Sequence, residues 1–364
     1  MSRDRTDIYY WKCDREAAFH GTSDYVKDQS ALLAQLDAAL RARFGNALTN
    51  LRVAAGQGNH RTFRAELDGR DVFIRTEDGV EQDNYFAVEA EATRRVAATG
   101  VPVAETLAFD CSREKTSFAW QIIPYFPFAD LNTAVKAGTA DWTRLAPQIG
   151  RAIASWQEIT PEGFGPFSAA RAGAGEGLKG LHATHTAYYR LNLARHVDYL
   201  VRESFLAESE AARIMDAVAR HARLLEPERG VLVHKDLAVW NILGTPEDAK
   251  VYIDWDDCVG GDAMDDLSLM GVTGGAETQQ MIASYAAVRG LPPNAEPRFW
   301  LDWLRNIVFK AVIRVGAGYF RKDGDGFFLI GAGQNGNGLE AVTRRKIACA
   351  LDALEKGLGF EVIA

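Results

Sequence analysis

Three polar side chains follow a short apolar stretch in the second half of the chain. Residues 231–243 read VLVHKDLAVWNIL, in which His234, Asp236 and Asn241 come after an apolar run that is typical of a buried strand. A second run of β-branched and aromatic residues, KVYID, ends at Asp254. Polar groups beside a buried strand are costly unless a partner meets them. These side chains therefore either brace one another in a turn or hold a ligand.

The residue types favour the chemistry of a metal–phosphate site. Two carboxylates and a side-chain amide oxygen are hard donors that suit Mg²⁺. A carboxylate that is held off the metal can accept the proton of an attacking hydroxyl group, which is the division of labour in phosphoryl transfer. We interpret LVHKD and KVYID as a hairpin-type pair with a turn at residues 244–246. Asp236, Asn241 and Asp254 would then meet at one end of the pair. The motif HxD alone favours a simple loop brace, whereas Asn241 and Asp254 at this spacing reverse that preference.

Bulk composition excludes several classes of function. The 364 residues are enough for two lobes with separate cores. The formal net charge of -8 argues against nucleic acid as a partner, because binding phosphates along a backbone needs a basic face. The four cysteines are far apart and have no metal-site spacing, which is typical of a reducing compartment. Charged residues interrupt the most apolar stretch, 299–318, so it predicts a core helix rather than a membrane span. We expect a cytoplasmic protein.

The elements that must position the site have an α+β order, with strands first and helices after. The predicted elements are a helix over 31–44, three strands within 51–77 with a hairpin turn at Asp68–Gly69, a helix over 89–99 and a strand over 117–126. From about residue 130 the pattern is mostly helical, except near 231–255. Residues 1–30 are expected to form an ordered extension, because they hold too many aromatic side chains for a disordered tail.

Taken together, these segments resemble the aminoglycoside phosphotransferase and choline kinase-like family of small-molecule kinases. His234-x-Asp236-x4-Asn241 with Ile253-Asp254 is similar to the catalytic and metal-binding segments of that family. GGDAMDDL at 260–267 resembles its GDPxxDLA stretch, with alanine in place of proline. VEAEATRRVAATGVPVAETL and IGRAIASWQEITPEGFGPF resemble its small-lobe helix and the helix before its substrate-binding insertion. The likeness covers about residues 50–290. Trp156 stands where the family often has histidine, and Lys235 where it usually has glycine.

The resemblance implies a bilobal protein-kinase-like fold, with a small antiparallel-sheet lobe that has one helix and a large, mostly helical lobe. The implied boundaries are an extension at 1–30, a small nucleotide-binding lobe at 31–123, a hinge at 124–130 and a helical lobe at 131–364. ATP, or another nucleoside triphosphate, would lie between the lobes together with Mg²⁺. Its adenine would contact backbone groups from Gln121 to Ile123.

The resemblance also implies roles for the residues that match the catalytic motifs. Asp236 would be the catalytic base or the residue that orients the acceptor hydroxyl group, and His234 would brace the loop. Asn241 and Asp254 would hold Mg²⁺. These assignments make the stretch at 231–254 the centre of the predicted active site.

The nucleotide phosphates would be met by residues of the small lobe. The cation at the end of VFIR, Arg75, is expected to pair with Glu89 and to touch the phosphates, with Glu91 as an alternative partner. Gly56 and Gly58 stand where the phosphate-covering loop belongs, because glycine lets backbone N–H groups approach phosphate oxygens closely. The same two glycines are equally typical of an ordinary hairpin turn.

Acidic residues are concentrated around the motifs. Residues 231–270 contain nine acids and two lysines, a balance of -7 (2 minus 9), against -8 for the whole chain. Asp256, Asp257 and Asp262 have no obvious cation to meet them, and concentrated negative charge attracts cations. We therefore predict that these three acids bind an amine-bearing acceptor. The alternative is that they are solvated or paired with arginines of the helical lobe.

The predicted function is transfer of the γ-phosphoryl group of ATP to a hydroxyl group of a small molecule. An antibiotic such as an aminoglycoside is the first choice of acceptor, and the alternative is a metabolic kinase for an amino alcohol, homoserine or a sugar. A nucleotide-binding pseudokinase is the alternative from another class, and the complete set Asp236, Asn241 and Asp254 argues against it. Neither nucleic acid nor a membrane is an expected partner, and no oligomeric state follows from the sequence.

Overall fold

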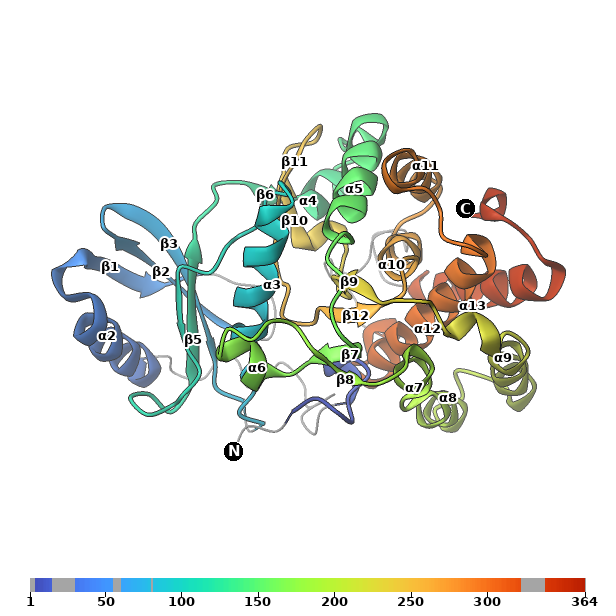
Figure 1. Cartoon of the computed structure of the whole chain (residues 1–364), viewed down its shortest axis with the longest axis horizontal. Coiled ribbons are helices and arrows are strands. Elements are labelled where there is room, and N and C mark those ends of the chain that lie inside the picture. The colour runs from blue at the N-terminus through green and yellow to red at the C-terminus, as the bar shows by residue number, and fades with distance from the viewer. Residues whose placement is uncertain (1–3, 15–29, 55–59, 80, 322–337, 364) are drawn as a thin grey trace.

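A five-stranded antiparallel sheet forms one end of the molecule (Figure 1). The structure is a computed structural model that describes residues 4–14, 30–54, 60–79, 81–321 and 338–363. The strand order is β1-β2-β3-β5-β4, and the strands are β1 (Leu48–Val53), β2 (Arg61–Leu67), β3 (Arg70–Glu77), β4 (Ala108–Asp110) and β5 (Ala119–Pro124). Asp68 and Gly69 form the turn between β2 and β3, both with positive φ, as the sequence predicts.

Two helices flank this sheet. Helix α2 (Ser30–Phe44) packs beside β1 and ends at Gly45, which confirms the helix predicted over 31–44. Helix α3 (Phe86–Ala98) lies between the sheet and the rest of the molecule (Figure 1). It starts three residues before the predicted bound, and residues 99 and 100 close it by hydrogen bonds to the carbonyls of Val96 and Ala97.

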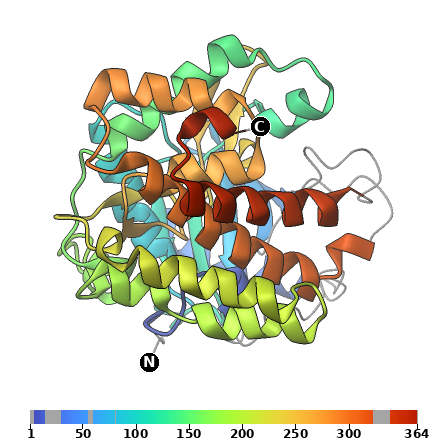
Figure 2. The same cartoon turned by 90° about the vertical axis from the view of Figure 1, so that its right-hand side faces the viewer.

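The rest of the chain is dominated by helices. They are α4 (Leu131–Lys136), α5 (Trp142–Trp156), α6 (Ala169–Gly173), α7 (His185–Arg190), α8 (Leu193–Arg202), α9 (Glu208–Arg220), α10 (Asp265–Thr273), α11 (Glu277–Arg289), α12 (Ala295–Gly316) and α13 (Leu339–Lys356). Short 3₁₀ turns lie at Gly45–Ala47, Ala222–Leu225, Val239–Asn241, Tyr319–Arg321 and Phe360–Val362. Helices α12 and α13 run side by side, as Figure 2 shows. Helix α12 contains the apolar stretch that the sequence assigned to the core, and most of its side chains are buried.

Two small antiparallel sheets lie among these helices. One has the order β11-β10-β6, with β6 (Ala129–Asp130), β10 (Ile242–Gly244) and β11 (Ala249–Tyr252). The other has the order β8-β7-β12-β9, with β7 (Phe164–Phe167), β8 (Gly180–His182), β9 (Val231–Val233) and β12 (Val259–Gly261). The expectation of strands only near 231–255 is therefore wrong for β6, β7, β8 and β12. These strands have two to four residues, which is too short for a period of two to show.

The predicted pairing of LVHKD with KVYID is also wrong. Strand β9, which holds VLV, pairs with β12, whereas β11 pairs with β10. The turn at residues 244–248 closes the hairpin of β10 and β11 instead, with hydrogen bonds between Thr245 and Asp248. Two short apolar runs satisfy the same pattern whichever neighbour they take, so the sequence does not determine the partner.

The buried apolar side chains form two main clusters. The smaller one joins the sheet to α2, and includes Leu36, Leu40, Phe63, Ile74 and Trp120. The larger one spans the helical part and takes in Val88, Ala92 and Val96 of α3. Helix α3 is therefore held by the large core as well as by contacts to β4 and β5. A residue on α3 can consequently be positioned against both parts of the molecule.

The start of the chain is built into the large core. Helix α1 (Trp11–Asp14) is short, but Tyr9, Tyr10 and Trp11 are buried. The ring of Tyr9 stacks on Tyr188 and that of Tyr10 on Phe309 of α12. The expected ordered extension is thus observed for residues 4–14, whereas its other aromatics, Phe19 and Tyr25, fall outside the described residues.

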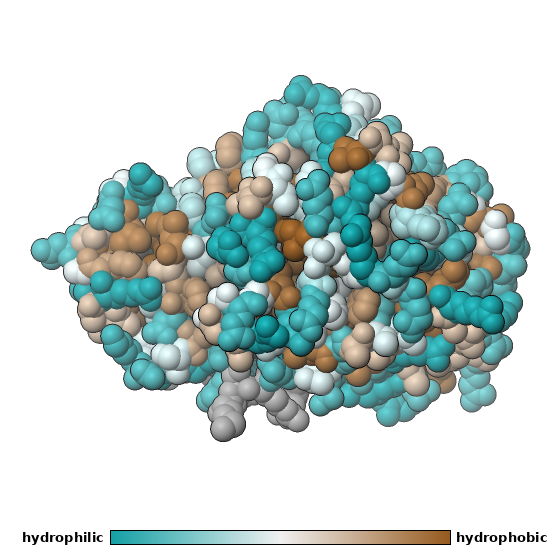
Figure 3. Space-filling view, in the orientation of Figure 1, coloured by the Kyte–Doolittle hydropathy of each residue, from teal (hydrophilic) through white to brown (hydrophobic). Residues whose placement is uncertain are grey.

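The surface is mostly hydrophilic. Figure 3 shows hydrophilic side chains over most of one face, with apolar residues scattered between them. The exposed large hydrophobic residues lie on separate elements, as Val53 of β1, Met215 of α9 and Val288 of α11 do. Among the described residues, no helix is both long enough and apolar enough to cross a membrane.

Candidate functional site

The loop after β9 is fixed by buried hydrogen bonds. The backbone N–H groups of His234 and Lys235 donate to the two carboxylate oxygens of Asp266, at 3.0 and 3.2 Å. The imidazole Nε2 of His234 donates to the carbonyl of Ile253 at 2.9 Å, and burial lowers the pKa of this histidine. A neutral ring with its proton on Nε2 meets both observations. His234 therefore joins the two motif segments even though their strands do not pair.

Trp156, one of the departures from the family pattern, serves the same loop. Its indole Nε1 donates to Asp266 at 3.1 Å, and its ring packs edge-on against Trp255. Asp266 is fully buried, and burial raises its pKa to about 7. A carboxylate at this depth needs donors to keep its charge, and the indole N–H adds a third to the two backbone groups.

Lys235, the other departure, has a left-handed backbone conformation with φ of +68°. Glycine adopts this conformation without cost, but a lysine does not. The Lys235 ammonium group is buried and donates to Asp265, Tyr9 and Asn306 at 2.8, 2.8 and 3.1 Å. The side chain therefore offsets the backbone strain by joining the loop after β9 to the N-terminal segment and to α12.

Asp236 is nearly completely buried and lies between two ammonium groups. Lys12 Nζ is 2.6 Å from Oδ2, and Lys310 Nζ of α12 is 3.0 Å from Oδ1. Burial opposes the negative charge, but these two cations hold the pKa of Asp236 far below its usual range. Asp236 is consequently an anion that can accept hydrogen bonds, and it holds a proton only weakly.

Asn241 and Asp254 are brought beside Asp236 by the backbone. The amide Nδ2 of Asn241 donates to the carbonyl and the carboxylate of Asp236, at 2.8 and 3.4 Å. The N–H of Ile253 donates to the carbonyl of Asn241 at 3.0 Å, which holds the residue before Asp254 against the loop. Because Nδ2 is used by Asp236, the Asn241 side chain keeps its oxygen as the group available to a cation. An amide oxygen and a partly exposed carboxylate fit the donor chemistry of Mg²⁺.

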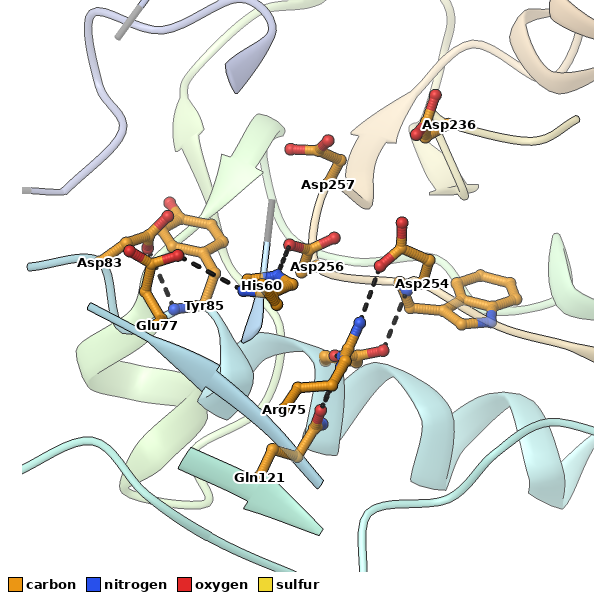
Figure 4. A network of polar contacts seen from close by, with 12 residues as sticks. His60, Arg75, Glu77, Asp83, Tyr85, Gln121, Asp236, Asp254, Asp256 and Asp257 are labelled. Atoms are coloured by element: carbon orange, nitrogen blue, oxygen red, sulfur yellow. Dashed lines mark hydrogen bonds and ion pairs between the residues drawn. The ribbon is translucent and has the colours of Figure 1, made fainter. Parts of the chain in front are cut away.

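A second network joins the sheet, α3 and Asp254. Figure 4 shows Arg75 of β3 directed at Asp254 and Gln121. Arg75 pairs with Asp254 at 2.7 Å, and its other terminal nitrogen contacts Glu89 of α3. The alternative partner, Glu91, instead pairs with Arg94 and Arg95 of its own helix. The structure thus brings together the predicted pair, and its role on nucleotide phosphates stays a prediction.

The predicted adenine contact does not fit at Gln121. Gln121 is paired with Arg75 of β3 on one side and with Phe109 of β4 on the other. A strand therefore flanks its main chain on each side. Its side chain reaches Arg75 and Thr106. Ile123 lies beyond the last paired residue of β4 and stays a candidate. Gly56 and Gly58 fall outside the described residues.

The expectation that three acids lack a cation is wrong. Asp256 is 3.3 Å from the imidazole Nε2 of His60, and Asp257 is 2.8 Å from Arg5. Asp262 pairs with Arg298 of α12 at 2.7 Å, which is the arginine pairing named as the alternative. The cations come from elements distant in sequence, so the local charge balance did not predict them. Binding of an acceptor by these acids stays a prediction, but the reason for it is removed.

Lys12 and Lys310 are the site residues that the sequence analysis missed. Neither belongs to a recognisable motif, and they lie 224 and 74 residues from Asp236. One signal was present. Lys310 is a charged residue within an apolar helix, and a buried charge requires a partner. Lys12 is likewise a charged residue among apolar neighbours, because it lies in an aromatic-rich segment.

Comparisons with known proteins agree with this geometry. Residues 50–300 match the model of the phosphotransferase enzyme family. A search of curated protein sequences finds no match. Among solved structures, aminoglycoside phosphotransferase APH(4)-Ia is similar, with a TM-score of 0.60 and 16% identity over 90% of this chain and 99% of that one. A ternary complex of a thermostable mutant of the same enzyme with AMP-PNP and hygromycin B has a TM-score of 0.58 and 19% identity, covering 88% and 98%.

A protein from Thermobifida fusca that is assigned as a fructosamine-3-kinase is similar to the same degree. It has a TM-score of 0.60 and 16% identity over 88% of this chain and 98% of that one. At these identities the likeness establishes the fold. The predicted fold class, a bilobal kinase-like α+β structure, is confirmed.

Proposed function

Because the chain belongs to the phosphotransferase enzyme family, we propose that it transfers the γ-phosphoryl group of ATP to a hydroxyl group of a small molecule. The observation that carries the proposal is Asp236. It is a buried anion that Asn241 contacts, and Asp254 of the neighbouring motif segment is contacted by Arg75, which also pairs with Glu89. The related enzyme in complex with AMP-PNP and hygromycin B supports a nucleotide and a small-molecule acceptor.

Each residue has a defined part in this reaction. Asp236 accepts a hydrogen bond from the acceptor hydroxyl group and orients its oxygen toward the γ-phosphorus. As the new O–P bond forms, the bond from the γ-phosphorus to the bridging oxygen breaks, ADP leaves, and the hydroxyl proton passes to Asp236 and on to solvent. Lys12 and Lys310 keep Asp236 an anion, so its main part is to orient the hydroxyl group.

Asn241 and Asp254 would hold Mg²⁺, which neutralises phosphate charge when it is bound. Arg75 supports this arrangement from the sheet. Its contacts to Glu89 and Gln121 fix the guanidinium group, and its contact to Asp254 orients that carboxylate. Arginine stays charged at every physiological pH, so it can also meet phosphate oxygens.

The structure supports a metabolic acceptor better than an aminoglycoside. The acids that were expected to attract an amine are all paired with cations of the chain. The similarity to a protein assigned as a fructosamine-3-kinase shows that this fold is not confined to antibiotic kinases. We place the enzyme in the cytoplasm, where ATP is available and where its four free cysteines stay reduced.

The test is an assay of ADP formation by the full chain with Mg²⁺, ATP and a panel of small alcohols. Asp236→Asn should lower kcat by roughly 10²-fold or more, because it removes a positioned anion, while calorimetry shows nearly unchanged ATP binding. Asp248→Asn is the matched control, since Asp248 lies in the exposed turn between β10 and β11 and pairs with Arg144. Undiminished acceptor-dependent turnover in Asp236→Asn would overturn the proposed role, and absence of ATP binding by the wild type would overturn the function.

A further inference from the structure

Asp236 is contacted by two basic residues to which the motifs assign no role. Lys12 comes from the N-terminal segment and Lys310 from α12, whereas the residues assigned to nucleotide and metal lie on β3, α3 and the two motif segments. A single ammonium group would balance the charge of this buried carboxylate. Two ammonium groups on one carboxylate leave a local surplus of positive charge.

Arg314 adds to this surplus. It follows Lys310 by four residues on α12, so the two side chains lie on the same face of the helix. Arg314 is 8% exposed, and its hydrogen bond within the described part of the chain is to the hydroxyl group of Thr343, at 2.7 Å. No carboxylate of the described residues pairs with it. Burial lowers its pKa to about 10, as expected for a guanidinium group that lacks an anion.

The positive groups act on one another. Burial lowers the pKa of Lys310, and the positive charges of Lys12 and Arg314 lower it further. The negative charge of Asp236 raises it. Repulsion of this kind is costly unless an anion is present for part of the working cycle. Asp257 and Asp254 add to the raised pKa of Lys12, but their direct ion pairs are with Arg5 and Arg75, and neither pairs with Lys310 or Arg314.

The two lysines keep hydrogen-bonding capacity for such an anion. An ammonium group has three donors, and among the described residues Lys12 and Lys310 each make one hydrogen bond, to Asp236. The Lys12 side chain is 28% exposed, so an incoming group can reach it from solvent. A carboxylate likewise accepts more hydrogen bonds than the ones Asp236 receives here, which leaves a place for an acceptor hydroxyl group.

We propose that Lys12, Lys310 and Arg314 form a subsite for an anionic group of the acceptor, which is therefore a small hydroxylated acid carrying a carboxylate or a phosphate ester. The proposal rests on the proposed phosphotransferase function and reverses the sign of the charge that the sequence predicts for the acceptor. The anion would bind the cations while a hydroxyl group of the same molecule binds Asp236. Two-point binding of this kind positions a small acceptor for transfer.

Four three-carbon probes that differ in charge test the subsite. They are glycerol, glycerate, glycerol 3-phosphate and 3-aminopropane-1,2-diol, each titrated calorimetrically into the full chain with saturating ADP and Mg²⁺. Glycerate or glycerol 3-phosphate should bind at least about tenfold more tightly than glycerol, and the amine should bind most weakly, because charge-assisted hydrogen bonds are the strong ones. The better of the two anions identifies the carboxylate or the phosphate ester as the natural group.

Three substitutions locate the binding. Lys12→Met, Lys310→Met and Arg314→Met should each weaken the preferred anion by about tenfold or more, with affinity for ADP changed less than twofold. Lys250→Met is the control, since this exposed lysine of β11 pairs with Asp248. Lys12 is partly exposed, so Lys12→Met is expected to fold. It therefore tests the subsite even where a substitution in α12 disturbs folding. Thermal melting of each variant is measured beside the titration.

Three outcomes would overturn the subsite. They are equal affinity for all four probes, tightest binding of the amine, and unchanged anion affinity in the variants. A larger loss of affinity for ATP than for ADP in Lys12→Met and Lys310→Met would also overturn the subsite, because the lysines would then bind the γ-phosphate. Each of these results leaves ATP binding and the effect of Asp236→Asn intact, so failure of the subsite is distinct from failure of the proposed function.

Discussion

The side chains that carry the proposed chemistry differ in how far their partners lie along the chain. His234, Asp236, Asn241 and Asp254 belong to two neighbouring segments, and their spacing together with the family resemblance predicted a shared site, although the strand pairing assumed for it is wrong. Their neighbours were not predictable in this way. Lys12 and Lys310 reach Asp236 only because the chain folds the N-terminal segment and α12 onto the catalytic loop. Local spacing reveals motifs, and long-range charge pairing needs the fold.

The two proposed metal ligands should differ in importance. Asp254→Ala removes a charged ligand that phosphate oxygens cannot replace, so Mg²⁺-dependent ATP binding should be lost. Asn241→Ala removes a neutral amide and should weaken ATP binding less, although it also removes the hydrogen bond from Asn241 to Asp236. Calorimetric titration of ATP with and without Mg²⁺ measures both effects. Equal losses in the two variants would contradict this division of roles, and Asp248→Asn again serves as the control.

Among the elements, those with long and regular patterns were predicted and the short ones were not. Helix α2 and the strands β2 and β3 have clear periods and a glycine turn, so their bounds are close to the expected ones. The strands β7, β8, β9 and β12 have three or four residues each and are defined only by their partners. The pairing of β9 with β12 instead of β11 is the clearest example. A hydrophobic period can be recognised only in an element that is long enough to repeat it.

The N-terminal segment should contribute to stability as well as to the site. Deletion of residues 1–26 should lower the melting temperature, because Tyr9 and Tyr10 are buried against Tyr188 and Phe309. Burial of two such rings is worth roughly 3 kcal/mol or more. Tyr10→Ala should reproduce part of the loss in the full-length chain, whereas Phe128→Ala, at a partly exposed ring, should not. Unchanged melting of the truncated protein would show that the segment adds no stability.

In the whole molecule, ion pairs join the sheet to the helical part. Arg5 pairs with Asp83, just before α3, and with Asp257 of the segment after β11. His60 lies between Glu77 at the end of β3 and Asp256 beyond β11. Figure 4 shows His60 between these two carboxylates. The motifs and their resemblance were sufficient to predict the fold class, but they gave no information on these links, because each one joins residues far apart in sequence.

The His60 link makes the stability of the whole molecule depend on pH. Both ring nitrogens lie near a carboxylate, at 3.4 Å for Glu77 and 3.3 Å for Asp256, which favours the doubly protonated imidazolium. Burial opposes this charge, but the hydrogen bonds to Asp256 and Glu77 raise the pKa of His60 to about 10, with Arg75 as a smaller opposing charge. A raised pKa in the folded state adds stability that is fully present below pH 6.5 and is lost as pH rises toward 10. The loss over this interval is on the order of 5 kcal/mol.

His60→Gln should therefore be less stable than the wild type below pH 6.5, and the difference should shrink as pH rises to 10. Glutamine can donate a hydrogen bond, but it carries no charge that titrates. Denaturant unfolding at pH 6, 7, 8, 9 and 10 measures the difference, and comparing the two proteins cancels the alkaline titration of the other groups that they share. His221→Gln on α9 is the control, because His221 contacts only the carbonyl of Ala217 in the described structure. A difference between wild type and His60→Gln that stays constant across this range would show that the imidazole is neutral and that the two parts of the molecule are not linked by its charge.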